Sequence, residues 1–187
     1  MNNGYKVIEG FLGLEFTQFV EQYFITRFSS GVNVHYGDNQ SPRCMSIYGD
    51  PLGDTILKLC TDHVSTIVGK QLLPTVSFTR LYHRGDHLKV HLDRPSCEYS
   101  ATLCLAYPSG ESPSPIYFND KKTPTDAHKV VLKRGDLCIY EGCKYYHWRD
   151  PIETDYLLQV FLHWVDSGGE YRDMVFDNRG NLGIMSK

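Results

Sequence analysis

The sequence has no long hydrophobic run. None of the apolar stretches in its 187 residues approaches the roughly 20 residues that a membrane-spanning helix needs. The first ten residues, MNNGYKVIEG, also have no basic segment followed by an apolar one, which a secretory signal would require. We therefore expect a chain with neither an export signal nor a membrane partner.

The chain also has no excess of positive charge. Lys and Arg number 19 against 22 Asp and Glu, which gives a formal net charge of -3. A protein that holds nucleic acid through its phosphates needs a basic surface. The charge balance therefore argues against a nucleic-acid partner, although a local basic patch is compatible with it.

Cysteine pairs are missing too. The six cysteines, at positions 44, 60, 97, 104, 138 and 143, include no C-x-x-C pair, the spacing on which zinc ribbons and redox motifs depend. Several of them lie in apolar, strand-like segments, so we interpret them as buried free thiols rather than as a disulfide framework. Free thiols are typical of a reducing compartment, and this predicts a cytoplasmic protein.

What the sequence does have is a change of hydrophobic period. In 11–28 and again in 52–71, apolar side chains recur every three or four residues, which predicts two helices. From residue 75 the period changes to two, and turn signals separate about seven short strands: 75–83, 87–93, 99–107, 115–118, 129–132, 137–141 and 156–165. This order indicates a single α+β domain of the sandwich or jelly-roll type. The polar tail after Asp166 is predicted to be a surface hairpin around 177–181 or a frayed end.

One short motif carries the chemistry. His91 and Asp93 lie two apart on a predicted strand, so both side chains point to the same face and can meet at one metal ion. His147 follows an aromatic run after the strand 137–141 and offers a third ligand. Two histidines and one carboxylate leave the other side of a metal open, as in non-haem Fe(II) oxygenases. A structural zinc site would instead close all four positions, usually with cysteine.

These residues resemble a known family. Tyr82, nine residues before His91, then Asp93, and His147 after the Gly135-Asp136 turn, resemble the Fe(II)/2-oxoglutarate-dependent dioxygenases, and most closely the prolyl 4-hydroxylase-like branch. The segments 107–118 (YPSGESPSPIYF) and 132–140 (LKRGDLCIY), together with Pro151, are similar to that branch as well.

The resemblance implies a fold and a division of the chain. The fold is a double-stranded β-helix, a cupin-like jelly roll, with His91 and Asp93 on one core strand and His147 on another. It covers about residues 76–165, which would form the core. Residues 1–75 would then be supporting helices and a loop, and 166–187 a tail, all within one oxygenase domain.

The resemblance also implies a reaction. Its cofactors would be Fe(II) bound by the two histidines and Asp93, 2-oxoglutarate as co-substrate and O2, with ascorbate as a stimulant. 2-Oxoglutarate would be decarboxylated to succinate while an aliphatic C–H is hydroxylated, on a prolyl or other amino-acid residue or on a free small molecule. Asp93 favours oxygen transfer, because halogenating relatives replace this carboxylate with a small residue. The partner would be a small-molecule, peptide or protein substrate; its identity and the oligomeric state stay open.

One position departs from the prolyl 4-hydroxylase pattern. That branch carries a lysine about ten residues after the distal histidine to bind the C5 carboxylate of 2-oxoglutarate, and Leu157 stands there in this chain. A half-buried carboxylate still needs a cation. Arg149 is our first candidate because its fork can hold a carboxylate at two points, and Arg80 is the second. Gln159 and the phenol of Tyr82 could add hydrogen bonds.

Substrate contacts are predicted beside the metal motif. Arg94 and Glu98 follow Asp93 in a kinked polar segment, and they could bind a zwitterion or a peptide, or simply pair with each other. Trp148, next to the distal histidine, could form the floor of the pocket or pack in the core. The loops 33–50 and 108–128 could act as lids.

Two other functions fit the same pattern. The segment from Arg80 to His91 also resembles the alkylated-nucleobase demethylases of the superfamily, but the pair of arginines that this branch carries after its distal histidine is absent. The missing lysine also leaves room for a non-catalytic, cupin-like protein that binds a metal or a small ligand.

Overall fold

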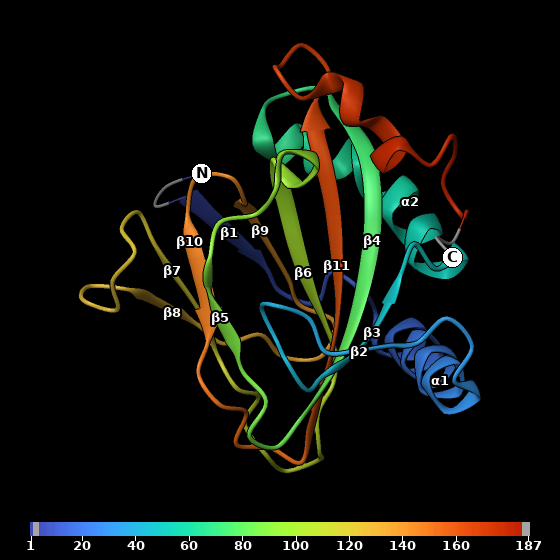
Figure 1. Ribbon diagram of the computed structural model, residues 1–187, viewed down its shortest axis with the longest axis vertical. Helices are drawn as coiled ribbons and strands as arrows, with labels where there is room; N and C mark the ends of the chain where they lie inside the picture. The colour runs from blue at the N-terminus through green and yellow to red at the C-terminus, as the bar shows by residue number, and fades with distance from the viewer. Residues whose placement is uncertain (2–3, 185–187) are drawn as a thin grey trace.

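Two antiparallel sheets face each other in the computed structural model, which describes residue 1 and residues 4–184 (Figure 1). The first sheet has seven strands in the order β1 (Tyr5–Ile8), β9 (Leu137–Glu141), β6 (Tyr99–Ala106), β11 (Tyr156–Asp166), β4 (Leu72–His83), β3 (Met45–Tyr48) and β2 (His35–Tyr36). The second has four strands in the order β5 (Leu88–His91), β10 (Tyr146–Arg149), β7 (Ile116–Asn119) and β8 (His128–Val130). The α+β jelly roll predicted from the sequence is confirmed.

Two helices cover the outer face of the seven-stranded sheet, on the side away from the four-stranded sheet (Figure 1). Helix α1 (Leu14–Ser30) buries one face against it and ends at Gly31, whose φ of 68° closes the helix in the left-handed region. Helix α2 (Pro51–Val68) begins at Asp50, whose carboxylate accepts a hydrogen bond from the backbone of Leu52. Together they confirm the two predicted helices and support the sheet from behind.

Strand alternation divides the core into two clusters. On β11, Leu158, Val160 and Leu162 face the helices, whereas Leu157 and Phe161 face the space between the sheets. The same alternation on β4 turns Tyr82 inward. The space between the sheets, called here the barrel interior, is therefore reached by every second residue of its strands, and these residues set its chemistry.

The structure adds strands that the sequence pattern did not predict. Strand β1 pairs with β9 through Tyr5 and Tyr140, so the N-terminal segment extends the first sheet. Strand β10 carries His147 within an aromatic run that has no clear period of two. β10 pairs with β5 across a bulge whose extra residue lies on β5.

The prediction for the C-terminal tail was wrong. Residues Arg172–Asn178 form 3-10 turns rather than a hairpin, and the segment is held against the sheet. The carboxylate of Asp177 accepts hydrogen bonds from Arg94 and Tyr48, and Arg179 bonds Asp54 and the carbonyl of Thr75. A polar, Gly-rich sequence indicates solvent exposure, but here its charges have partners on the core.

Other sequence expectations concern the thiols and the membrane. All six cysteines are free, and five of them are buried, which confirms the thiol interpretation. Across the described residues, we find no helix with the length and apolar character needed to cross a bilayer.

Candidate metal centre and the barrel interior

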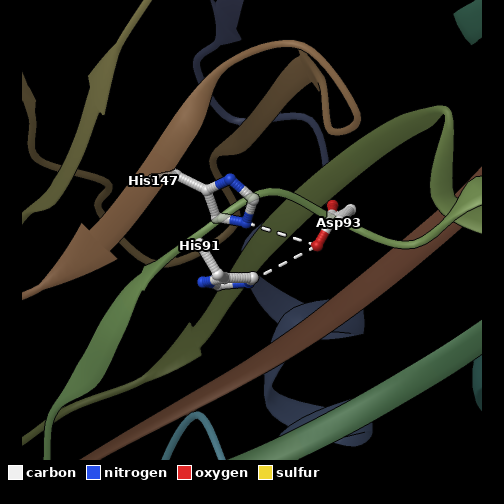
Figure 2. Close-up of side chains that lie close together, drawn as sticks. All are labelled: His91, Asp93 and His147. Carbon is white, nitrogen blue, oxygen red and sulfur yellow. Dashed lines mark ion pairs between the residues drawn. The ribbon is translucent and has the colours of Figure 1, made fainter. Parts of the chain in front are cut away.

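Three predicted ligands converge at one point between the sheets (Figure 2). His91 ends β5 and lies directly opposite His147 on the neighbouring β10, and Asp93 follows β5 by two residues. Asp93 Oδ1 lies 3.5 Å from His91 Nε2 and 3.4 Å from His147 Nε2. Ligand atoms from all three residues lie within 4.8 Å of one another. The register of two strands therefore gathers the set that the sequence proposed.

Both imidazoles present the nitrogen that a metal would need. His91 Nδ1 lies 2.8 Å from the carbonyl oxygen of Lys89, and His147 Nδ1 lies 3.1 Å from that of Tyr145. A carbonyl oxygen can only accept, so each ring carries its proton on Nδ1. Both Nε2 atoms then face Asp93 Oδ1 and are the atoms that a metal would bind, while Nδ1 is held by a backbone carbonyl, as is usual for histidine ligands.

The carboxylate of Asp93 is held from behind. Its Oδ2 accepts a hydrogen bond of 2.7 Å from the hydroxyl of Ser100, while Oδ1 faces the histidines. A Cβ at Gly142 would collide with Oδ2 and with that hydroxyl, so only glycine leaves room here. Burial by itself would raise the pKa of Asp93, but the neighbouring imidazoles, above all His147, hold it well below the usual range. Asp93 is therefore an anion fixed in one orientation.

The donor set fits ferrous iron. Two imidazole nitrogens and one carboxylate oxygen occupy one side of a common point, which is the two-histidine, one-carboxylate arrangement of non-haem Fe(II) sites. The described residues offer no cysteine or further carboxylate to close it as a structural zinc site. The remaining positions are available to exogenous ligands.

A buried arginine lies next to this centre. Arg149 is two residues after His147 on β10, so both side chains enter the barrel interior about 7 Å apart along the strand. Its Nη1 donates to the carbonyl of Ser114 at 2.8 Å, its Nη2 to Gln159 at 3.3 Å, and its Nε has no partner. Within the described residues it has no carboxylate partner, and burial lowers its pKa. A buried cation with only neutral partners is costly, so this position calls for an anion.

The other predicted 2-oxoglutarate residues surround Arg149. Gln159 Oε1 accepts from Arg149 and, at 2.7 Å, from the hydroxyl of Thr102. Tyr82 is fully buried, its hydroxyl accepts a hydrogen bond of 3.5 Å from Arg80, and it is near enough to Arg149 to act on the pKa of that guanidinium. Arg80 is as deeply buried as Arg149, but it forms an ion pair with Asp38 of the loop that leads to β3. We call Arg149, Gln159 and Tyr82 the arginine end of the barrel interior.

The predicted substrate residues lie in three different environments. The guanidinium of Arg94 pairs with both oxygens of Asp177 at 2.6 and 2.5 Å, and not with Glu98. Glu98 accepts a hydrogen bond from the backbone of Asp166 at the end of β11. Trp148 stacks on Tyr117, on the opposite face of β10 from the metal ligand. Of the three, only Arg94 borders an opening to the metal centre.

That opening is a cavity of about 350 Å³ beside Asp93. Its walls combine apolar side chains with a few polar groups. The lining residues are Gln40, Tyr48, Val76, Phe78, Leu92, Asp93, Arg94, Cys97 and His163. Gln40 belongs to the 33–50 loop and contacts β5 through a hydrogen bond between its carbonyl and the backbone of Lys89. This predicted lid therefore borders the cavity and, through Asp38, is paired with Arg80.

Sequence reasoning missed several residues of the site. Ser100, Thr102 and His163 hold the ligand-facing groups, and Asp38 neutralises Arg80. Buried hydroxyls on a strand resemble ordinary strand residues, so composition gave no signal for them. The period of two offered one signal: Ser100 and Thr102 share a face of a predicted core strand, where polar side chains need partners.

Comparisons with known proteins identify the fold. No family model matches the sequence, and no curated protein matches it. Solved structures match over nearly the whole chain. A prolyl hydroxylase from Trichoplax adhaerens, in complex with a hypoxia-inducible-factor peptide fragment, has a TM-score of 0.71 at 16% identity, with 92% of this chain and 87% of that chain covered.

Two further structures have the same architecture. The non-heme alpha-ketoglutarate-dependent carbocyclase SnoK of nogalamycin biosynthesis has a TM-score of 0.72 at 13% identity, covering 99% of this chain and 89% of its own. HygX from Streptomyces hygroscopicus, with nickel, 2-oxoglutarate and hygromycin B bound, has a TM-score of 0.66 at 14% identity, covering 89% and 84%. At such identities the similarity establishes the double-stranded β-helix fold, and function has to be argued from the site.

Proposed function

We propose that this protein is an Fe(II)/2-oxoglutarate-dependent oxygenase that hydroxylates an aliphatic C–H bond. One observation carries the proposal: a three-ligand metal centre and a buried arginine without a carboxylate partner share the barrel interior, two residues apart on β10. The centre needs a cation and Arg149 needs an anion. A metal ion chelated by one end of a dicarboxylate meets both requirements, because the other carboxylate is free to pair with Arg149.

In this proposal each residue has a defined task. His91, Asp93 and His147 hold the iron, which with 2-oxoglutarate bound supplies the oxidising power for activating O2. The Nε–H of Arg149, which has no hydrogen-bond partner among the described residues, and an adjacent Nη–H donate to the C5 carboxylate. Gln159 and Tyr82 orient the guanidinium and the carboxylate toward each other. Arg80 holds the 33–50 loop through its ion pair with Asp38. It is the second candidate for binding the C5 carboxylate.

The cavity beside Asp93 is the proposed substrate site. Its volume of about 350 Å³ is at the lower end of the range for small-molecule pockets and also admits a single side chain of a peptide. Asp177 uses two of the five N–H groups of Arg94, so others can meet a polar group of the substrate. The placements of Glu98 and Trp148 do not support a role for them there.

Turnover of 2-oxoglutarate tests the proposal. Protein reconstituted with Fe(II) and ascorbate should release succinate and CO2, and the ferrous protein should gain a weak visible absorption on adding 2-oxoglutarate without O2. Asp93→Ala should abolish both signals, whereas Asp62→Ala on the exposed face of α2 should keep them. A protein that only binds zinc or a ligand would show neither signal in its unmodified form, and the proposal would fail.

Hydroxylation is the finer part of the proposal and needs its own readout. Hydroxylation with 18O2 places one oxygen atom in succinate and the other in the product alcohol. The carbocyclase among the similar structures shows that this fold also supports other oxidations. If 2-oxoglutarate is consumed together with substrate but the product carries no 18O label, the assignment of iron and 2-oxoglutarate stands and hydroxylation is overturned. Removal of a methyl group from an alkylated oligonucleotide would instead favour the demethylase alternative.

A further inference from the structure

We infer that strand β6 positions the two halves of the site separately, through two buried hydroxyls. Ser100 orients the metal ligand Asp93, and Thr102 orients Gln159 and through it Arg149. Both are positioning residues, since neither would touch the metal or 2-oxoglutarate. The inference rests on the proposed function, because it assigns the metal and the dicarboxylate to these two places.

The first relay runs from His163 through Ser100 to Asp93. Ser100 Oγ lies 2.7 Å from Asp93 Oδ2 and 2.9 Å from His163 Nδ1. A carboxylate only accepts and a hydroxyl has one proton, so Ser100 donates to Asp93 and His163 donates to Ser100. The carbonyl of Cys97, at 3.2 Å, is a longer alternative acceptor. Ser100 is fully buried. Among the described residues, it is the one hydroxyl or amide donor that bonds the side chain of Asp93.

The second relay runs from Thr102 through Gln159 to Arg149. Thr102 is two residues after Ser100 on β6, so both hydroxyls face the barrel interior. Its Oγ1 donates to Gln159 Oε1 at 2.7 Å, and Arg149 Nη2 donates to the same oxygen at 3.3 Å. This fixes the amide oxygen toward the guanidinium and keeps Arg149 on one side of the interior.

The two relays share a strand but no residue. Their hydroxyls are buried to the same degree, with Ser100 and Thr102 both at 0% exposed. Removing either hydroxyl should therefore destabilise the packing by a similar amount, whereas the affinities for the metal and for 2-oxoglutarate should change differently. Partners that orient a metal ligand are worth about 10–100-fold in metal affinity. Loss of one neutral hydrogen bond changes an affinity by about 5-fold.

The test is a pair of binding constants measured on matched variants. Mn(II) is titrated without 2-oxoglutarate, and 2-oxoglutarate is then titrated anaerobically into Mn(II)-saturated protein. Ser100→Ala should weaken Mn(II) at least about 10-fold and change 2-oxoglutarate affinity less than 2-fold. Thr102→Val should weaken 2-oxoglutarate about 5-fold and leave Mn(II) within 2-fold, and Thr102→Ser should restore it.

The outcomes separate the two proposals. If the unaltered protein binds neither Mn(II) nor 2-oxoglutarate, the proposed function fails. If it binds both and the two variants weaken both ligands alike, or weaken neither, the separate relays are overturned. Where Ser100→Ala does not fold, Ser100→Cys keeps the volume with a weaker donor and should lower Mn(II) affinity in the same direction.

Discussion

The two ends of the barrel interior carry opposite unmet charges. At the metal centre, the anion of Asp93 faces the Nε2 atoms of His91 and His147 through its Oδ1. At the arginine end, Arg149 is a cation among neutral oxygens. Each arrangement is costly when nothing is bound, and a metal at one end with a carboxylate at the other would neutralise both.

The two buried arginines sharpen this comparison. Arg80 and Arg149 are each 3% exposed, yet Arg80 pairs with Asp38 whereas Arg149 has no acidic partner among the described residues. Burial alone therefore does not mark a ligand site. What distinguishes Arg149 is burial without compensation; the sequence already ranked it before Arg80, but it could not show that Arg80 has an acidic partner.

Asp93→Asn should have the largest effect on the metal end. It keeps the shape of the side chain but removes the anion, so we expect Mn(II) affinity to fall at least about 100-fold, beyond the range for partners that only orient a ligand. Thermal unfolding with and without Mn(II) checks this, because at a fixed concentration a ligand stabilises the folded state by an amount that grows with the logarithm of its affinity. A Tm shift by Mn(II) equal to that of the unaltered protein would mean that the carboxylate is no ligand.

Arg149→Met should break the arginine end while sparing the fold. Loss of a buried charge partner costs about 2–5 kcal/mol of binding, so 2-oxoglutarate affinity should fall at least about 30-fold. The ligand-free protein should keep its Tm or gain stability, because an uncompensated buried charge is removed. The measurements are titration of the Mn(II)-loaded protein with 2-oxoglutarate and thermal unfolding of the apoprotein.

Arg80→Met is the matched control. It removes an equally buried guanidinium, but one whose charge Asp38 already balances. We expect 2-oxoglutarate affinity to change less than about 3-fold and stability to fall by about 1 kcal/mol, as for a partly exposed ion pair. If Arg80→Met weakened 2-oxoglutarate more than Arg149→Met did, the assignment of the two arginines would have to be exchanged.

The sequence predicted the metal end better than the arginine end for a physical reason. His91 is the last residue of β5 and Asp93 lies two residues beyond it, so closeness in sequence already brings them together even though the predicted strand 87–93 ends at His91. The metal set is then completed by one register, that of β10 on β5. The arginine end combines β4, β6, β10 and β11, and its selectivity depends on Asp38 in a loop. Such long-range pairing is not encoded in any local period.

The fold shows the same division. The helices and the long strands follow from periodicity, and they were predicted within a few residues. Strand β1 and the segment 172–178 were not, because a four-residue edge strand and a polar tail have no period that distinguishes them from loops. They are held by partners that are distant in sequence, such as Tyr140 for β1 and Arg94 for the tail.

Acidification should probe the first relay through its histidine. Burial lowers the pKa of His163 to about 4, whereas an unfolded histidine titrates near 6.5. Between these values the unfolded chain binds more protons, so the free energy of unfolding falls as the pH falls. For the metal-free protein this one group should remove about 3 kcal/mol between pH 7 and pH 4. His163→Gln should flatten that slope in denaturant titrations, whereas the exposed His63→Gln should leave it unchanged.

Arg94→Gln should have the smallest effect on both ends, because its guanidinium lies outside them. Arg94 follows Asp93 in sequence and lines the cavity beside it, but its charge is directed to Asp177 of the tail. Affinities for Mn(II) and 2-oxoglutarate should therefore stay within about 2-fold, and stability should fall by about 1 kcal/mol from the lost, half-exposed ion pair. Isothermal titration of both ligands measures this. A large loss of either would show that the tail and Asp177 act on the metal centre itself, and the barrel interior would then have three coupled regions rather than two independent ones.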